Sequence, residues 1–338
     1  MRRFIAPPPG RGVSPGPRPT FSVVIPVYNA AATVGESIES ALAQTSPPHE
    51  VVVCDDGSTD DLDRALEPYH DRIVLVRKEN GGGASALNAA ARRASGDFVV
   101  VLDSDDAYLP ERLDALSELA GARPDLDILT TDALYESGGR VVGRFNGPAN
   151  PFAASAQREE ILKRCFILMP AVRRARVLEL GGWYESLAIG YDWDCWLRLI
   201  FDGALAGSVD EPLVRYRFHD TSLSARRVDS LRERVTILER AASDPRLTEA
   251  ERALVATSHA DHRRTAQLAE AQEAIRDARP DARARLLTVA REPTFGRRTR
   301  TRALVLAHTP ASLRRWLLPM VGFGGRFERR HIPGESRE

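Results

Sequence analysis

The stretch Val99-Val100-Val101-Leu102-Asp103-Ser104-Asp105-Asp106 carries four apolar residues directly into a cluster of carboxylates. An apolar run of this length is typical of a buried strand. Mg²⁺ and Mn²⁺ prefer oxygen ligands, use one or two carboxylates, and take further ligands from bound phosphates. The alternative is a strand that ends in a solvated acidic turn, since Asp is common in turns. The rest of the chain favours the metal-and-diphosphate site.

From Phe21 onward, short apolar runs alternate with segments of helical period, a pattern that predicts a mostly parallel α/β sheet flanked by helices. Val34, Ile38, Ala41 and Leu42 would share one face of the first helix. Ligands of such sheets gather at the carboxyl ends of the strands. The expected strands are 21–27, 50–54, 72–76 and 97–102, and a further helix is expected over 84–94.

The 338 residues suggest one catalytic domain with an appendage. We expect a flexible Pro/Gly-rich leader over 1–19, a catalytic domain over 20–225, and a helical, Arg-rich region over 226–338. The last region has 24 Arg against 15 acidic residues, whereas the whole chain has 47 basic and 47 acidic residues. Solvated helix faces explain such a basic balance as well as a separate binding surface does.

Cys54, Cys165 and Cys195 lie far apart and form no metal-ligand pair, so we interpret them as buried thiols in a reducing compartment. No stretch reaches the roughly 20 apolar residues of a membrane-spanning helix, and residues 1–19 lack the apolar core of a secretory signal. The expected location is the cytoplasm.

Three common phosphate or metal motifs are missing. A nicotinamide enzyme would carry G-x-G-x-x-G after the first strand, where this chain has Pro26-Val27-Tyr28-Asn29. The Walker pattern G-x-x-x-x-G-K is absent, and Tyr108 stands where a calcium loop needs Gly. A bound metal is therefore the expected means of holding a phosphate.

Six motifs follow one another along the chain: Val23-Val24-Ile25-Pro26-Val27-Tyr28-Asn29, Asp55-Asp56-Gly57-Ser58-Thr59-Asp60, Asn80-Gly81-Gly82-Gly83, Leu102-Asp103-Ser104-Asp105-Asp106, Gly181-Gly182-Trp183-Tyr184-Glu185 and Tyr191-Asp192-Trp193-Asp194-Cys195-Trp196-Leu197-Arg198. Together they resemble the family 2 glycosyltransferases, over roughly Phe21 to Ser224. The resemblance implies a GT-A fold, a nucleotide-diphospho-sugar donor, a divalent metal (Mn²⁺ or Mg²⁺) and inversion at the anomeric carbon.

The resemblance also implies a pocket for the donor nucleotide. Asp56 would accept a hydrogen bond from the base, although an Asp before Gly57 also suits a turn. Gly82 and Gly83 would bring backbone N–H groups close to the donor, although a flexible loop would look the same. Many family members have Arg where this chain has Leu87, which removes an ionic contact. The other residues implied for this pocket are Pro26, Tyr28, Asn29, Asn88 and Asp103.

In the acidic cluster, the family pattern makes Asp105 the direct metal ligand, with Asp103 contacting ribose or coordinating through water. Asp106 would support both from behind. In the closing segment, strand alternation puts Arg215, Arg217 and His219 on one side, toward the diphosphate or the metal. We take Arg217 as a closing-segment residue and His219 as a candidate metal ligand, although a lone His is more often structural.

Asp192 is the candidate general base, placed before an amphipathic segment over 193–201, with Asp194 as its rival. Asp is also a good helix N-cap, and both roles can hold together. Trp183, Tyr184 and Trp193 could stack on an acceptor sugar, with core packing as the alternative, which we favour for Trp196.

The predicted function is transfer of one sugar to a hydroxyl of a glycan, a lipid-linked sugar or a small molecule. The alternatives are a sugar nucleotidyltransferase and a protein that binds nucleotide sugars without catalysis. Beyond Ser224 we expect helices over 230–242 and 248–279. The stretch 312–323 mixes basic and apolar residues, so it could contact a membrane peripherally or dock on the catalytic domain. No nucleic-acid partner is expected.

Overall fold

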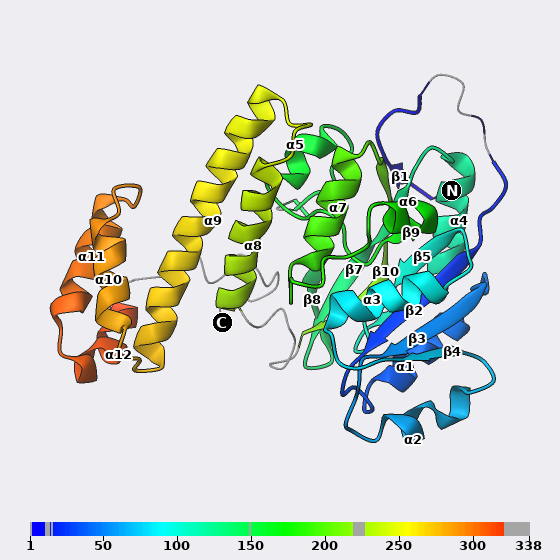
Figure 1. Cartoon of the computed structure of the whole chain (residues 1–338), viewed down its shortest axis with the longest axis horizontal. Coiled ribbons are helices and arrows are strands. Elements are labelled where there is room, and N and C mark those ends of the chain that lie inside the picture. Colours follow the sequence, from blue (N-terminus) through cyan, green and yellow to red (C-terminus); the bar gives the residue numbers. More distant parts are fainter. Residues whose placement is uncertain (1, 11–13, 15, 149, 219–226, 321–338) are drawn as a thin grey trace. The chain divides into compact units, whose positions relative to one another are not determined.

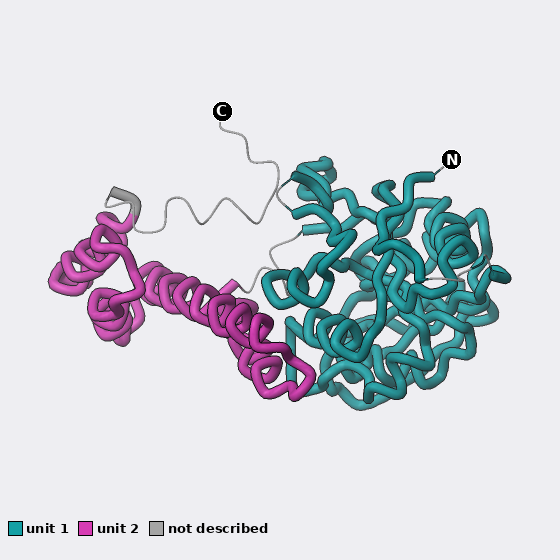
Figure 2. Tube along the Cα trace, turned by 90° about the horizontal axis from the view of Figure 1, so that it is seen from above, with its two compact units in different colours: residues 1–219 teal, residues 220–338 magenta. Residues whose placement is uncertain are grey.

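The computed structural model describes residues 2–10, 14, 16–148, 150–218 and 227–320, except for the side chains of residues 319 and 320. The chain divides into two compact units, residues 1–219 and 220–338 (Figure 2). Each unit has helices and an apolar core of its own.

A mixed sheet forms the centre of the first unit (Figure 1). Neighbours β2, β3 and β4 run parallel, β5 runs parallel to β2, and β9 is antiparallel to both β5 and β7. The observed sheet and helices confirm the expected α/β fold class. In spatial order the strands are β1 (Phe4–Ile5), β10 (Ala206–Phe218), β7 (Ile128–Ser137), β9 (Ala171–Arg173), β5 (Phe98–Val101), β2 (Phe21–Val27), β3 (Glu50–Asp55) and β4 (Val74–Arg77), with β6 (Ala107–Tyr108) pairing with β10 and β8 (Arg140–Arg144) with β7.

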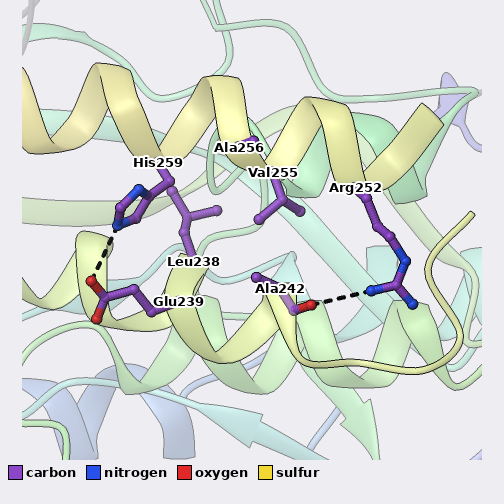
Figure 3. Close-up of a pocket in the computed structure, with 7 residues that line it drawn as sticks. All are labelled: Leu238, Glu239, Ala242, Arg252, Val255, Ala256 and His259. Atoms are coloured by element: carbon purple, nitrogen blue, oxygen red, sulfur yellow. Dashed lines mark hydrogen bonds and ion pairs between the residues drawn. The ribbon is translucent and has the colours of Figure 1, made fainter. Parts of the chain in front are cut away.

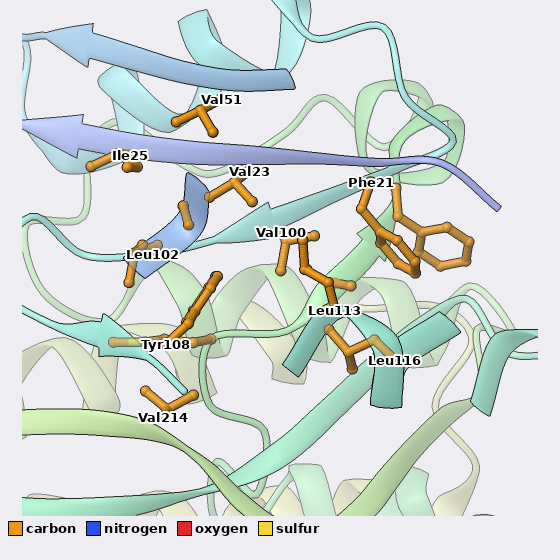
Figure 4. Packing of buried hydrophobic residues seen from close by; sticks show 14 of the residues in the cluster. Phe21, Val23, Ile25, Val51, Val100, Leu102, Tyr108, Leu113, Leu116 and Val214 are labelled. Atoms are coloured by element: carbon orange, nitrogen blue, oxygen red, sulfur yellow. The ribbon is translucent and has the colours of Figure 1, made fainter. Parts of the chain in front are cut away.

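The central strands are apolar on both faces because helices cover both sides. Val24 of β2 pairs with Val52 of β3 on one side and with Val101 of β5 on the other. On the face that carries Val23 and Ile25, the core extends to Leu113 and Leu116 (Figure 4). Burying each such side chain contributes about 1.5–3 kcal/mol, so this core holds the ends of β2, β3 and β5 in a fixed arrangement.

Helices α1 and α3 connect the central strands. The connection from β2 to β3 and the connection from β4 back to β5 run in opposite directions along the sheet. Because such crossovers are right-handed as a rule, the two helices lie on opposite faces. The strand expected over 72–76 lies at Val74–Arg77, and α3 begins at Gly83, one residue before the expected helix. The helices of this unit are α1 (Val34–Leu42), α2 (Leu62–Leu66), η1 (Glu67–Tyr69), α3 (Gly83–Arg93), α4 (Arg112–Ala122), α5 (Gln157–Ile161), α6 (Arg174–Glu179) and α7 (Tyr191–Phe201).

Part of the N-terminal segment is ordered against the sheet. Phe4 pairs with Val209 of β10, and Arg2 forms ion pairs with Asp114 at 2.8 Å and Glu118 at 3.1 Å. The edge of β10 offers unpaired backbone groups that an extended segment can satisfy. This pairing corrects the expectation of a flexible leader at these residues.

The second unit is helical in its described part. Its helices are α8 (Arg227–Ala242), α9 (Glu249–Arg276), α10 (Ala282–Arg291), α11 (Arg297–His308) and α12 (Ala311–Met320). Thr248 and Glu251 form a reciprocal capping box that begins α9. Ile275, Leu286 and Leu306 belong to a separate core shared by α9, α10 and α11. Over the described residues, no helix combines the length and the apolar character needed to cross a bilayer.

Candidate functional site

Polar residues follow β2, β3 and β5, which are adjacent and parallel in the sheet. Their carboxyl ends therefore meet at one edge. The sheet brings together the segments after Val27, Asp55 and Val101. Two of these segments are joined directly, because Asn29 Oδ1 accepts a hydrogen bond from the Thr59 N–H at 2.7 Å.

Asp56 organises the glycine loop ahead of α3. Its Oδ1 accepts hydrogen bonds from Lys78 Nζ at 2.7 Å and from the Gly81 N–H at 3.0 Å, and its Oδ2 accepts one from the Gly82 N–H at 2.7 Å. Its side chain is only 2% exposed. The carboxylate thus holds the loop inside the protein, and its expected contact with a base stays a prediction.

Lys78 is a site residue that the motifs did not indicate. Its partner Asp56 lies 22 residues away, and no spacing rule links the two positions. The available signal was its rarity, because Lys78 is one of two lysines among 47 basic residues.

Tyr28 and Asn29 differ in their availability to a ligand. Tyr28 is 52% exposed and can pack against a planar group. Asn29 adopts a left-handed conformation with φ of 50°, and its N–H donates to Ser58 Oγ at 3.0 Å. Asn29 shapes the loop beside Tyr28, while Pro26, the penultimate residue of β2, is half-buried.

The acidic loop follows β5 as expected. Asp103 and Asp105 are half-buried, whereas Asp106 is 1% exposed. Burial, and then the carboxylates of Asp192 and Asp105, raise the pKa of Asp103 well above its usual range. Burial, with the carboxylates of Asp103 and Asp105, also raises the pKa of Asp106. Carboxylates that repel one another in this way form a site that a cation would stabilise.

Arg217 fastens the acidic loop from β10. Its backbone N–H donates to Asp106 Oδ1 at 2.7 Å, and its Nη1 donates to the Asp105 carbonyl at 3.3 Å. The guanidinium also pairs with Glu36 of α1 and lies 3.9 Å from Glu136 of β7. Acidic groups of the protein thus surround Arg217, and its expected role toward a diphosphate stays a prediction.

Helix α7 begins at Tyr191, two residues earlier than expected, so Asp192 is its second residue. Gly190 occupies the N-cap position, so Asp192 is not the cap. Trp183 Nε1 donates a hydrogen bond to Asp192 Oδ1 at 3.1 Å. Burial raises the pKa of Asp192 to about 7, and this hydrogen bond opposes the rise. A carboxyl group with such a pKa suits proton transfer near neutral pH.

The rival Asp194 has a different environment. It is buried, and its Oδ2 accepts a hydrogen bond from Arg198 Nε at 2.7 Å within the same helix. A carboxylate in this pairing stabilises the helix. The geometry therefore favours Asp192 over Asp194 as a base.

Two of the three aromatic residues expected to contact an acceptor are buried. Trp183 is 1% exposed and packs edge to face on Trp196, and the buried Trp193 donates its Nε1–H to the Ile161 carbonyl at 2.7 Å. Neither can stack on a sugar in this structure, which corrects that expectation. Tyr184 is exposed, and the guanidinium of Arg198 lies 4.7 Å from the centre of its ring.

Asn88 of α3 is buried and joined to the segment that precedes α7. Its Nδ2 donates to the Trp183 carbonyl at 2.8 Å and to Glu185 Oε1 at 3.0 Å, and its Oδ1 accepts from the Trp183 N–H at 2.9 Å. These bonds occupy both ends of the amide within the protein. Asn88 thus has a structural role, and its expected contact with the donor stays a prediction.

Gly83 adjoins Tyr191, the first residue of α7, and sequence reasoning did not find this contact. A Cβ added at Gly83 would lie 2.7 Å from Tyr191 Oη. Gly82 has a φ of 88°, and a Cβ there would meet nothing within 4 Å. The glycine loop thus needs Gly82 for its positive φ, and it needs Gly83 because Tyr191 leaves no room for a Cβ.

The described residues offer only part of a metal site. Within those ranges, no three or more His, Cys, Asp or Glu side chains cluster as they do in a complete metal cage. His219, the third expected ligand, lies outside the described residues. Asp103 and Asp105 fit a Mg²⁺ or Mn²⁺ ion that takes its other ligands from phosphate and water.

A cavity of about 400 Å³ lies in the second unit, between α8 and α9 (Figure 3). Leu238, Ala242 and Val255 line it, and His259 Nε2 lies 3.2 Å from Glu239 Oε1. These residues belong to none of the motifs described above. All three cysteines are free thiols, as expected, although Cys165 is only half-buried.

Residues 22–176 match the family described as Glycosyl transferase family 2. A glycosyltransferase of Rickettsia typhi, itself uncharacterized, is 27% identical over 64% of this chain and 69% of its own length. A Bacillus subtilis glycosyltransferase named for teichuronic acid biosynthesis, TuaG, is 29% identical over 62% of this chain and 82% of its own.

Two solved structures have a similar fold. Staphylococcus aureus TarS 1–349 in complex with UDP aligns with a TM-score of 0.60 at 18% identity, over 90% of this chain and 88% of that one. The mannosyltransferase PcManGT of Pyrobaculum calidifontis, in complex with GDP-Man and Mn²⁺, aligns with a TM-score of 0.56 at 20% identity, over 93% and 88%. These likenesses confirm the GT-A fold.

Proposed function

From the match of residues 22–176 to Glycosyl transferase family 2, we propose that this chain is a glycosyltransferase of that family and that it carries out a metal-dependent, inverting transfer of a single sugar. The donor would be a nucleotide-diphospho-sugar. The acceptor would be a hydroxyl of a glycan, a lipid-linked sugar or a small molecule. The two similar solved structures are named as complexes with UDP and with GDP-Man, and these names support this class of donor.

The relation between Asp192 and the acidic loop carries the proposal. The Asp192 carboxylate is near enough to Asp103 to raise its pKa, and the pKa of Asp192 itself is about 7. A base and a cation-binding loop within electrostatic reach of each other can act on the two sides of one reacting carbon. This arrangement supports transfer over binding alone.

Asp105 and Asp103 would hold the metal, with His219 as a further candidate ligand. A bound Mn²⁺ or Mg²⁺ would act as a Lewis acid that neutralises charge on the departing nucleoside diphosphate. The mutual repulsion of Asp103, Asp105 and Asp106 supports a cation at this place, because each carboxylate is easier to ionise beside positive charge.

The donor nucleoside would lie where the segments after β2 and β3 meet. The exposed ring of Tyr28 supports packing of the base there, and Pro26 and Asn29 would line the same pocket. Asp56 would act mainly by holding Gly81 and Gly82, and the loop of Gly82 and Gly83 would approach the diphosphate. Asp103 would contact the ribose, directly or through the metal.

In the reaction, one bond forms as another breaks. The acceptor hydroxyl oxygen attacks the anomeric carbon from the side opposite the diphosphate, which inverts the configuration. The bond from that carbon to the phosphate oxygen breaks, and the nucleoside diphosphate leaves with the electron pair. The hydroxyl proton moves to the Asp192 carboxylate, a step that contributes about 10²–10⁴-fold in rate.

Titration calorimetry tests the donor site with UDP, GDP and dTDP, each with Mn²⁺ and with EDTA. We expect one of the three to bind only with the metal, and metal-independent binding would contradict the proposal. Asp192→Asn should keep this binding and lose transfer, while Asp194→Asn serves as the control for loss of a carboxylate on the same helix. An Asp192→Asn variant with full activity would remove the proposed base.

We further propose that the C-terminal helices contact the anionic surface of a membrane, which would suit a lipid-linked acceptor at the cytoplasmic face. Residues 293–327 contain seven Arg and neither Asp nor Glu. Leu304 and Val305 of α11 and Leu313 of α12 are about half exposed, and Trp316 is 77% exposed. Basic residues interspersed with exposed apolar ones suit the headgroup region.

Flotation of the full chain with vesicles tests this contact. We expect binding to phosphatidylglycerol vesicles and not to neutral phosphatidylcholine vesicles, with a loss of roughly tenfold or more in Leu313→Ala/Trp316→Ala. Val141→Ala removes an exposed apolar side chain of the first unit and should leave binding unchanged. Absence of binding by the unaltered chain would refute the proposal.

A further inference from the structure

We propose that Trp183 is a positioning residue for the Asp192 carboxylate, and that Asn88 holds Trp183 in the place where it does this. The three side chains form a relay from α3 to the first turn of α7. The inference rests on the proposed function, because the relay affects transfer only if Asp192 is the base. The hydrogen bonds of the relay are themselves independent of any donor or acceptor.

The first contact of the relay is made by the buried indole N–H of Trp183, which can donate in only one direction. An indole has a single N–H and no acceptor, so a buried indole satisfies its polarity with one partner. That partner is Asp192 Oδ1, 3.1 Å from Trp183 Nε1. The ring packs edge to face on Trp196, with centroids 5.9 Å apart and an interplanar angle of 82°. Packing thus fixes the direction of the N–H.

The second step fixes the backbone of Trp183. Asn88 binds both the N–H and the carbonyl of this residue, at 2.9 and 2.8 Å, so the amide matches one backbone unit at two points. Gly182 permits this approach. Its φ is 74°, and a Cβ at this position would collide with Asn88 Oδ1. Asn88 therefore supplies the amide for the contact with the Trp183 backbone, and Gly182 leaves the space for it.

The consequence concerns the two oxygens of Asp192. Trp183 takes Oδ1, which leaves Oδ2 to receive a proton, and the carboxylate cannot rotate without breaking a buried hydrogen bond. The hydrogen bond also favours the ionised form against the effect of burial on the pKa. Among the residues that the structure describes, Asp103 of the acidic loop and Tyr191 and Cys195 of α7 also interact electrostatically with Asp192.

Nuclear magnetic resonance of the full chain with ¹⁵N-labelled tryptophan tests the contact without any substrate. The four indole N–H signals are followed from pH 5 to 9 in EDTA, and Trp183→Phe and Trp196→Phe assign two of them. We expect the Trp183 signal to move with pH and its movement to vanish in Asp192→Asn, while the Trp196 signal stays unchanged. A Trp183 signal that is the same in the unaltered chain and in Asp192→Asn would overturn the proposal.

Kinetics of matched variants test the function of the relay. Trp183→Phe and Trp196→Phe each remove one indole of the same buried pair, but only the first removes the hydrogen bond to Asp192. For Trp183→Phe we expect kcat to fall about 10- to 100-fold, the KM of the donor to stay the same, and the acid limb of the pH profile to move to higher pH. Trp196→Phe should keep the original pH limb.

The outcomes separate this inference from the proposed function. A fully active Asp192→Asn enzyme would remove the base and therefore the function of the relay. An inactive Asp192→Asn enzyme, together with Trp183→Phe and Trp196→Phe enzymes of equal kcat and equal pH profile, would leave the base in place and overturn the relay alone. Asn88→Ala should repeat the kinetic changes of Trp183→Phe in weaker form, and unchanged kinetics there would remove Asn88 from the relay.

Discussion

The backbone N–H of Arg217 donates a hydrogen bond to Oδ1 of Asp106 at 2.7 Å, which ties strand β10 to the acidic loop. The two residues lie 111 positions apart in the chain. The guanidinium of the same arginine reaches the carbonyl of Asp105. The shape of the loop that presents Asp103 and Asp105 therefore depends on a residue from a distant strand.

We expect Arg217→Ala to weaken metal-dependent binding of the nucleoside diphosphate by about 10- to 100-fold, because a hydrogen bond from a charged group contributes about 1.5–3 kcal/mol. Calorimetry with Mn²⁺ present measures the change. Arg215→Ala is the control, since Arg215 lies on the same strand and its ion pair is with Glu136 at 3.5 Å. The backbone hydrogen bond to Asp106 persists in Arg217→Ala, so equal affinities of the two variants would show that the guanidinium of Arg217 does not shape the loop.

The rate of transfer should depend on pH through Asp192. Its carboxylate is the active form of the base, and its pKa is about 7, so activity is lost as the pH falls through that value. Below the pKa, kcat should fall about tenfold for each pH unit, which is the ordinary behaviour of one ionisation. Measurement of kcat from pH 5 to 9 with saturating metal checks this, and an acid limb centred near pH 4 would contradict it.

The two glycines ahead of Trp183 should respond differently to Ala. Gly181 has a φ of 85° and open space around a Cβ, so Gly181→Ala should cost about 1–2 kcal/mol in the free energy of unfolding. Gly182→Ala adds a collision with Asn88 to a similar backbone strain and should cost clearly more. Urea unfolding of both variants measures the difference, and equal losses would show that Asn88 can move aside.

A double-mutant cycle should reveal the contact between Gly83 and Tyr191. Gly83→Ala brings a methyl group to 2.7 Å from Tyr191 Oη and should destabilise the fold by about 1–3 kcal/mol. Tyr191→Phe removes that oxygen, so the double variant should recover part of the loss. Thermal unfolding of the four proteins gives the coupling energy. A coupling of zero would mean that the two residues do not meet.

The sequence alone determined the central strands and the place of the acidic loop. Phe21–Val27 and Glu50–Asp55 match the expected strands to within a residue, because continuous apolar runs bounded by polar residues are local signals of buried parallel strands. The family motifs, which are also short stretches of sequence, indicated the GT-A fold by their order along the chain. Parallel strands also end at one edge, so Asp103 and Asp56 could be assigned to a common region in advance.

Only the tertiary structure decided what the side chains of the site do. Asn88 meets Trp183 across 95 positions, and Trp183, which the sequence equally suited to stacking on a sugar, is buried against Trp196 with its N–H on Asp192. The N-terminal strand pairs with β10 although its composition is that of a leader. The physical reason is that a hydrogen bond depends on the position of its partner in space, and no local period or residue type encodes which distant backbone group will be there.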